Sequence, residues 1–135
     1  MAVGGQITPV PGYPQPFGSK LKMMFDRTGP TSYANIGSSS GGGDVLHNTD
    51  LGIGGFETCS VQWQGFSASG NYLVRVYTGT STTSITNSAP FSGQAVQSVV
   101  LVWYTASTAF VAGTAEVANA TNLSGESIRI DATCV

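Results

Sequence analysis

Charged residues are scarce in this chain. Aspartate, glutamate, lysine and arginine together make up 9% of its 135 residues, whereas a soluble domain usually has roughly a quarter. The net charge is −2 and the five basic residues form no stripe along the sequence. We therefore expect no basic surface of the kind that binds nucleic acid. Charged side chains help to keep a free monomer soluble, and this chain has few of them. We therefore expect much of its surface to lie against partners.

Long apolar runs and frequent cysteines are also absent. No segment approaches the roughly 20 apolar residues that a membrane-spanning helix needs, so we expect no membrane contact. The first residues lack the charged-then-apolar pattern of a secretory signal, and we therefore expect no export. Cysteine occurs only at Cys59 and Cys134, each within an expected strand. Without export, we interpret the two as buried thiols rather than as a disulfide.

Helical patterning is missing too. No window of ten residues carries apolar residues at the spacing of three and four that marks an amphipathic helix. The polar residues are mostly Ser, Thr, Asn and Gln, with 18 Gly, a composition typical of strands and turns. The length suits one core, and roughly seven strands are expected. We therefore predict an all-β fold, a single-domain antiparallel β-sandwich or barrel of the jelly-roll type.

Several stretches have the alternation or the apolar content of strands. The stretch 94–104 is apolar on both faces, as expected of a central or interface strand. A last short hairpin is expected within residues 109–117. The expected strands are Lys20–Asp26, Asp44–Leu46, Phe56–Gln64, Tyr72–Tyr77, Gln94–Tyr104 and Glu126–Val135. Leu21, Met23 and Phe25 are expected to share one face of the first of these strands. In the last strand, Ile128, Ile130 and Ala132 are expected to point inward.

The chain is organised around the stretch from Phe56 to Tyr77. Cys59, Val61 and Trp63 alternate with polar residues, as in a half-buried strand. The linker 67–71 contains glycine and asparagine, which tolerate the positive φ of a tight reversal. The residues that follow the linker are apolar on both faces. We therefore predict two antiparallel strands folded back on each other as a hairpin.

The N-terminal segment, residues 1–18, differs in kind from the rest of the chain. It holds four of the six prolines, a density that excludes helix and favours an extended arm. The alternative is a disordered tail. We predict an arm on residues 1–18 and a β-domain on residues 19–135. Interleaved with and flanking the prolines are four apolar residues that we predict to bind a partner: Ile7, Val10, Tyr13 and Phe17.

Catalytic and metal-binding patterns are weak. His47, the single histidine, is flanked by Asp44 and Asp50, but that spacing gathers ligands on a helix and this segment holds turn residues. No G-x-S-x-G elbow and no Cys-x-x-Cys is present, and the glycine runs do not open a helix as a phosphate cradle does. We therefore expect a protein that is not an enzyme, with no catalytic, cofactor or metal site.

The aromatic residues are the remaining candidates for binding. Trp63, Tyr72, Tyr77, Trp103 and Tyr104 all fall within expected strands. Aromatic residues are enriched in cores and at subunit interfaces, which is the interpretation we favour. The alternative is a carbohydrate-binding module in which Trp63 or Trp103 stacks on a sugar ring.

A set of short segments, in a fixed order, resembles the small structural proteins of tailed bacteriophages that are described as head decoration or cement proteins. The resemblance extends over roughly 43–130, most of the expected domain, and its closing part is the most recognisable. It does not include the N-terminal arm. The segments are GDVL (43–46), DLGIG (50–54), NYLVRVY (71–77), VVLVWYT (99–105) and AEVANATNLSGESIRI (115–130).

The resemblance implies a function without catalysis. Decoration proteins bind the outer surface of an expanded icosahedral head, so the implied partner is the major capsid protein and the implied location is the virion. Several such families form trimers and others dimers, so the resemblance implies a homo-oligomer, with the trimer favoured. Other virion parts, such as a small capsid subunit, a tail component or a fibre component, remain alternatives.

Overall fold

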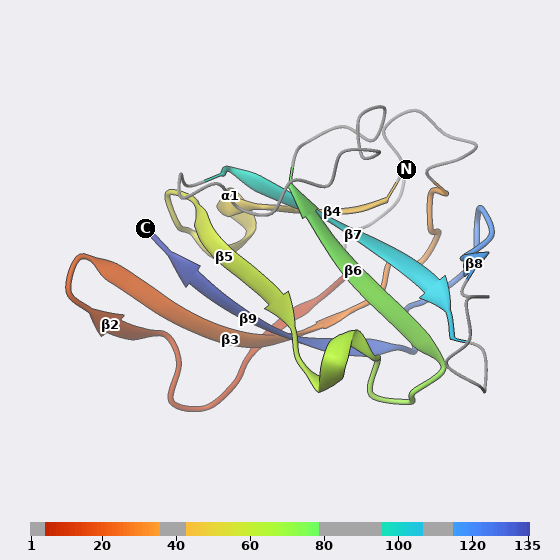
Figure 1. Cartoon of the computed structure of the whole chain (residues 1–135), viewed down its shortest axis with the longest axis horizontal. Helices are drawn as coiled ribbons and strands as arrows, with labels where there is room; N and C mark the ends of the chain where they lie inside the picture. Colours follow the sequence, from red (N-terminus) through yellow and green to blue (C-terminus); the bar gives the residue numbers. More distant parts are fainter. Residues whose placement is uncertain (1–4, 36–42, 79–95, 107–114) are drawn as a thin grey trace.

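A computed structural model describes residues 5–35, 43–78, 96–106 and 115–135 of the chain. These residues form two antiparallel sheets that pack face to face, and the predicted all-β sandwich is confirmed (Figure 1). Among the described residues the larger sheet comprises β1 (Ile7–Pro9), β2 (Gln15–Phe17), β3 (Lys20–Thr28), β5 (Phe56–Val61) and β9 (Ser127–Cys134). The smaller sheet comprises β4 (Asp44–His47), β6 (Tyr72–Thr78), β7 (Ser98–Thr105) and β8 (Ala115–Glu116).

The larger sheet is built on the pairing of β3 with β9. Its strand order is β1–β3–β9–β5, and β2 joins β1 along the same edge of β3. Along β9 the residues alternate between half-buried and buried, and Ile128, Ile130 and Ala132 are fully enclosed, as predicted. Met23 and Phe25 of β3 are buried on the same side. Hydrophobic alternation therefore sets the inner face of this sheet.

The smaller sheet is organised around β7, which pairs with β4 on one side and with β6 on the other. Val99, Leu101 and Trp103 pack in the core between the sheets, while Val100 and Val102 alternate with them on the opposite face and are also buried. The prediction of a central strand with two apolar faces is confirmed. Such a strand favours β-branched and aromatic residues, which β7 has in excess.

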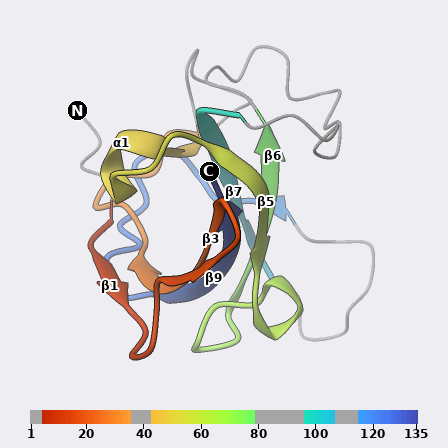
Figure 2. The same cartoon turned by 90° about the vertical axis from the view of Figure 1, so that its left-hand side faces the viewer.

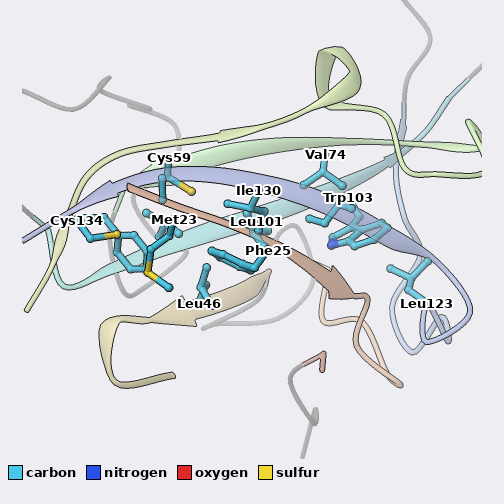
Figure 3. Packing of buried hydrophobic residues seen from close by; sticks show 14 of the residues in the cluster. Met23, Phe25, Leu46, Cys59, Val74, Leu101, Trp103, Leu123, Ile130 and Cys134 are labelled. Atoms are coloured by element: carbon cyan, nitrogen blue, oxygen red, sulfur yellow. The ribbon is translucent and has the colours of Figure 1, made fainter. Parts of the chain in front are cut away.

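The core lies between the two sheets. Figure 3 shows Phe25 and Ile130 from the larger sheet meeting Leu46, Leu101 and Trp103 from the smaller one. Viewed from its left-hand side, the molecule shows β1, β3, β9, β5 and β7 arranged around this common interior (Figure 2). An isolated bridge pairs Phe56 of β5 in the larger sheet with Val96, which precedes β7 of the smaller sheet. A second bridge, Phe66 with Leu73, lies within the connection that leads into β6.

The predicted hairpin between residues 56 and 77 is wrong. β5 pairs with β9 in the larger sheet, whereas β6 pairs with β7 in the smaller one. The predicted turn is present, since the amide of Ser67 donates to the carbonyl of Tyr72 over 2.9 Å, but the chain has already left the larger sheet by then. Trp63 is not in a strand: it opens the 3-10 turn η1 (Trp63–Gly65), where Trp63 and Gln64 have φ values of 59° and 58°.

After β4 the chain makes one turn of helix, α1 (Asn48–Leu51), which ends at Gly52 in the left-handed conformation. The carboxylate of Asp50 accepts a hydrogen bond of 2.9 Å from the amide of His47, which caps the helix start. Most of the hairpin expected within residues 109–117 lies outside the described residues.

The N-terminal segment lies along the edge of β3. β1 pairs with residues 25–27 and β2 with residues 20–22, and between them the amide of Val10 donates to the carbonyl of Met24 over 3.0 Å. Pro9 and Pro16 sit within these two strands. Because proline has no N–H group to offer a further strand, it is suited to an edge and discourages edge-to-edge association.

Removal of residues 1–18 should expose the backbone of β3 as a bare edge. We expect the shortened chain to keep its β-sheet circular dichroism but to self-associate at concentrations at which the full chain does not associate further. Sedimentation velocity over a range of concentrations measures this. A chain that lacks only residues 1–4 keeps β1 and β2 and serves as the control. Equal sedimentation of all three chains would contradict the protective role of the segment.

Candidate functional site

The four residues predicted to bind a partner lie along one edge of the larger sheet. Ile7 is half-buried and packs against the core, so part of its surface is already used inside the molecule. Val10 and Tyr13 are half-buried, and their backbones are joined by a hydrogen bond of 3.1 Å. The backbone of Phe17 pairs with Lys20. The structure therefore brings this set together along the outer edge of β3.

The sequence pattern around His47 does not form a metal site. Asp44 points into the core, the carboxylate of Asp50 is bonded to the amide of His47, and His47 is exposed. Within the part of the chain that the structure describes, no group of three or more His, Cys, Asp or Glu residues is arranged to hold a metal ion. The structure also describes no helix that is long and apolar enough to cross a bilayer.

A buried polar network connects the two sheets. Arg27 of β3 and Asp44 of β4 form an ion pair in which both side chains are only 2% exposed. The indole nitrogen of Trp103 also donates to the Asp44 carboxylate, over 3.3 Å. Burial raises the pKa of Asp44, and the guanidinium of Arg27 and the Trp103 N–H oppose this rise. Enclosed on all sides, this pair suits a structural role rather than contact with a substrate.

Tyr33 extends the network toward β8. Its hydroxyl donates to the Glu116 carboxylate over 2.8 Å and accepts from the backbone amide of Trp103 over 3.3 Å. Burial, together with the bond to Glu116, raises the pKa of Tyr33 far above its ordinary value. The hydroxyl therefore stays protonated and acts as a fixed donor.

The outer face of the larger sheet carries most of the remaining charge, in neutral pairs. Lys20 contacts Glu57 at 2.7 Å and Lys22 contacts Asp131 at 2.5 Å. Arg129 binds Asp26 through two hydrogen bonds, of 2.7 and 3.0 Å. With the Arg27–Asp44 pair, four of the five basic residues are therefore neutralised within the chain. The hydrogen bonds from Arg129 lower the pKa of Asp26.

The two tryptophans have opposite surroundings. Trp103 is fully buried, so the alternative in which Trp103 stacks on a sugar is wrong. Trp63 is 46% exposed, and the guanidinium carbon of Arg129 lies 5.5 Å from the centre of its ring. The sequence placed Trp63 in a strand because it continues the alternation of Cys59 and Val61. Nothing in that pattern signals the left-handed turn that brings the side chain to the surface.

Both cysteines are free and buried, as predicted. Burial raises the pKa of Cys59 to about 12 and that of Cys134 to about 11. Since the thiolate is the reactive form, neither side chain is suited to act as a nucleophile near neutral pH.

Comparison with known proteins finds no matching protein family, no similar curated protein and no similar solved structure. The functional argument therefore depends on the chain itself.

Replacement of Asp44 by Asn should strongly destabilise the fold. The variant leaves the buried Arg27 charge without a counter-ion, which costs about 3–5 kcal/mol of unfolding free energy. Urea denaturation measures the loss. Changing Lys20 to Met removes a partly exposed ion pair with Glu57 at the surface of the sheet, and as a control it should cost about 1 kcal/mol or less. A loss for Asp44→Asn no larger than that of the control would contradict the structural role of the buried pair.

The cysteines should resist thiol reagents in the folded protein. At pH 8 only about one thiol in a thousand or fewer is ionised at pKa values near 11 and 12, and both side chains are enclosed. We expect labelling by a disulfide reagent to be slow in buffer and to reach two thiols per chain at once in denaturant. Rapid labelling of the folded chain, at the rate of a small free thiol, would show that the thiols are accessible.

Proposed function

We propose that this protein is a structural part of a virion, a decoration or cement protein that binds the outer surface of an icosahedral phage head. In this role it stabilises the shell across capsomer boundaries. The observation that carries the proposal is the resemblance of residues 43–130 to head decoration proteins. The partner is the major capsid protein, and the decorating unit is a homo-oligomer, with a trimer favoured over a dimer.

The physical character of the domain supports a structural role. The most deeply buried ion pair of the described residues, Arg27–Asp44, is enclosed between the sheets, where it joins one sheet to the other. The buried cysteines are held in their unreactive form. The buried ion pair and the buried thiols thus serve the packing of the domain, as expected of a permanent component of an assembly.

The edge of β3 is the surface that we assign to the shell. Val10 and Tyr13 are half-buried there, at the two ends of the turn between β1 and β2 that the hydrogen bond from the Tyr13 amide to the Val10 carbonyl closes. Since both strands pair with β3, this ordered segment has little conformational freedom to lose on binding. Many identical copies on a repeating lattice act together, so a modest contact per copy is enough for lasting attachment.

The direct test mixes the purified chain with heads that lack it and separates the mixture on a density gradient. We expect the chain to sediment with the heads, in a copy number comparable to that of the major capsid protein, and mild chaotrope to strip it while the shell stays whole. A chain that remains at the top of the gradient overturns the proposal. Assembly of shells by the chain alone would favour the alternative of a small capsid subunit, and recovery with tails would favour a tail or fibre part.

A double variant locates the contact. Changing Val10 and Tyr13 to Ser should weaken attachment to heads at least tenfold while the circular dichroism stays unchanged, because apolar contact area is lost. Changing Gln15 to Ala, an exposed residue of the same segment, is the matched control and should have no effect. Attachment of the double variant at full strength would move the contact away from this edge.

A further inference from the structure

Trp63 occupies a backbone conformation that bulky residues rarely adopt. Trp63, Gln64 and Gly65 follow one another with φ values of 59°, 58° and 91°. Only glycine enters this region freely, and each other residue costs about 1–2 kcal/mol there. Glycine at position 63 would remove that cost, yet this position carries a tryptophan, one of the two exposed large hydrophobic residues in the described part of the chain. Such an outlier points to a function for the side chain.

The turn that presents Trp63 is held firmly by its surroundings. The amide of Gln62 donates to the carbonyl of Arg129 over 2.7 Å, and the amide of Phe66 donates to the carbonyl of Trp63 over 3.1 Å. Gly65 lies so close to β6 that a side chain there would press on Leu73. The turn is visible as the coil between β5 and β6 in Figure 1.

The indole ring is positioned by a chain of polar contacts across the outer face of the larger sheet. Asp26 of β3 holds both the Nε and one Nη nitrogen of Arg129, over 2.7 and 3.0 Å. The guanidinium carbon then lies 5.5 Å from the centre of the Trp63 ring. An arginine stacked on one side of an indole restrains the ring. Since 46% of Trp63 stays exposed, the ring can receive a ligand from solvent.

The surroundings of the ring are polar and electrically neutral. Asp26 balances Arg129, and Lys22 balances Asp131 close by. The side chain of Gln62 donates to the Asp131 carboxylate over 3.3 Å, and Gln64 is exposed beside it. A flat apolar surface bordered by amides and paired charges complements a molecule that has one apolar face and a rim of hydroxyls.

We propose that Trp63 and its polar neighbours Asp26, Gln62, Gln64 and Arg129, together the Trp63 site, bind a neutral saccharide. The exposed side of the indole stacks on the C–H face of a pyranose ring, and the amides and the guanidinium bond its hydroxyls. A protein partner fits less well, because hot-spot tryptophans lie within apolar surroundings and this ring does not. An anionic sugar gains little, because the charge of Arg129 is already balanced by Asp26.

The site goes beyond the proposed structural role and does not depend on it. One indole and a few hydrogen bonds support only weak binding by a single copy. On a decorated head the site would be repeated many times, and avidity would turn weak contacts into adhesion to a glycan-bearing surface.

The test uses the full chain and a panel of immobilised neutral oligosaccharides of glucose, galactose, mannose and N-acetylglucosamine. Those that bind are then titrated in solution by tryptophan fluorescence. Because Trp103 is buried, a change on binding reports on Trp63. We expect at least one oligosaccharide to bind, Trp63→Ala to weaken that binding at least tenfold, and Trp63→Phe to weaken it less. Arg129→Met should weaken it severalfold.

Val135 supplies the matched control, because it has the same exposed fraction, 46%, and lies at the far end of β9. Val135→Ala should bind sugar as the original chain does. Absence of binding across the panel, or equal binding by Trp63→Ala, overturns the proposal. So does a protein partner that is lost in Trp63→Ala while no sugar binds. Attachment of the same variants to heads is measured separately, so failure of the sugar site and failure of the structural role are distinguishable.

Discussion

The ion pair between Arg27 and Asp44 fixes how the two sheets face each other. β3 supplies the guanidinium, β4 supplies the carboxylate, and the Trp103 indole from β7 donates to the same carboxylate. An apolar core alone allows several packings of similar energy. A charge separated from its partner in the interior costs several kcal/mol, so any sliding of one sheet over the other is strongly disfavoured. Burial of this pair adds little net stability, and we interpret it as a device that selects one packing.

The same strand carries this constraint to the outer surface. Residues of a strand alternate between its faces, so an inward Arg27 places its neighbour Asp26 outward, opposite Arg129 of β9. Asp26 then holds the guanidinium that lies against Trp63. A slip of β3 by one residue would bring Asp26 into the core and Arg27 out of it. The buried pair and the exposed tryptophan therefore depend on one register.

The sequence predicted the elements better than their connections. The inward faces of β3 and β9 and the central place of β7 follow from alternation and apolar content, which are local properties. Arg27 lies on the same parity as Met23 and Phe25, which is the one local signal of the buried pair. Pairing between distant strands is not local, so β5 and β6 were wrongly joined as a hairpin. The left-handed turn at Trp63 was missed because its conformation is imposed by contacts with β6 and β9.

Neutralisation within the chain decides what kind of association this surface supports. Four of the five basic residues are balanced by carboxylates of the same molecule, three of them on the outer face of the larger sheet. Steering by charge is therefore weak, and contacts depend on fit, apolar area and hydrogen bonds. Contacts of that kind are only slightly affected by salt, because screening acts on unbalanced charge. A protein with such a surface is suited to stay attached, or to hold a neutral ligand, across changes in ionic strength.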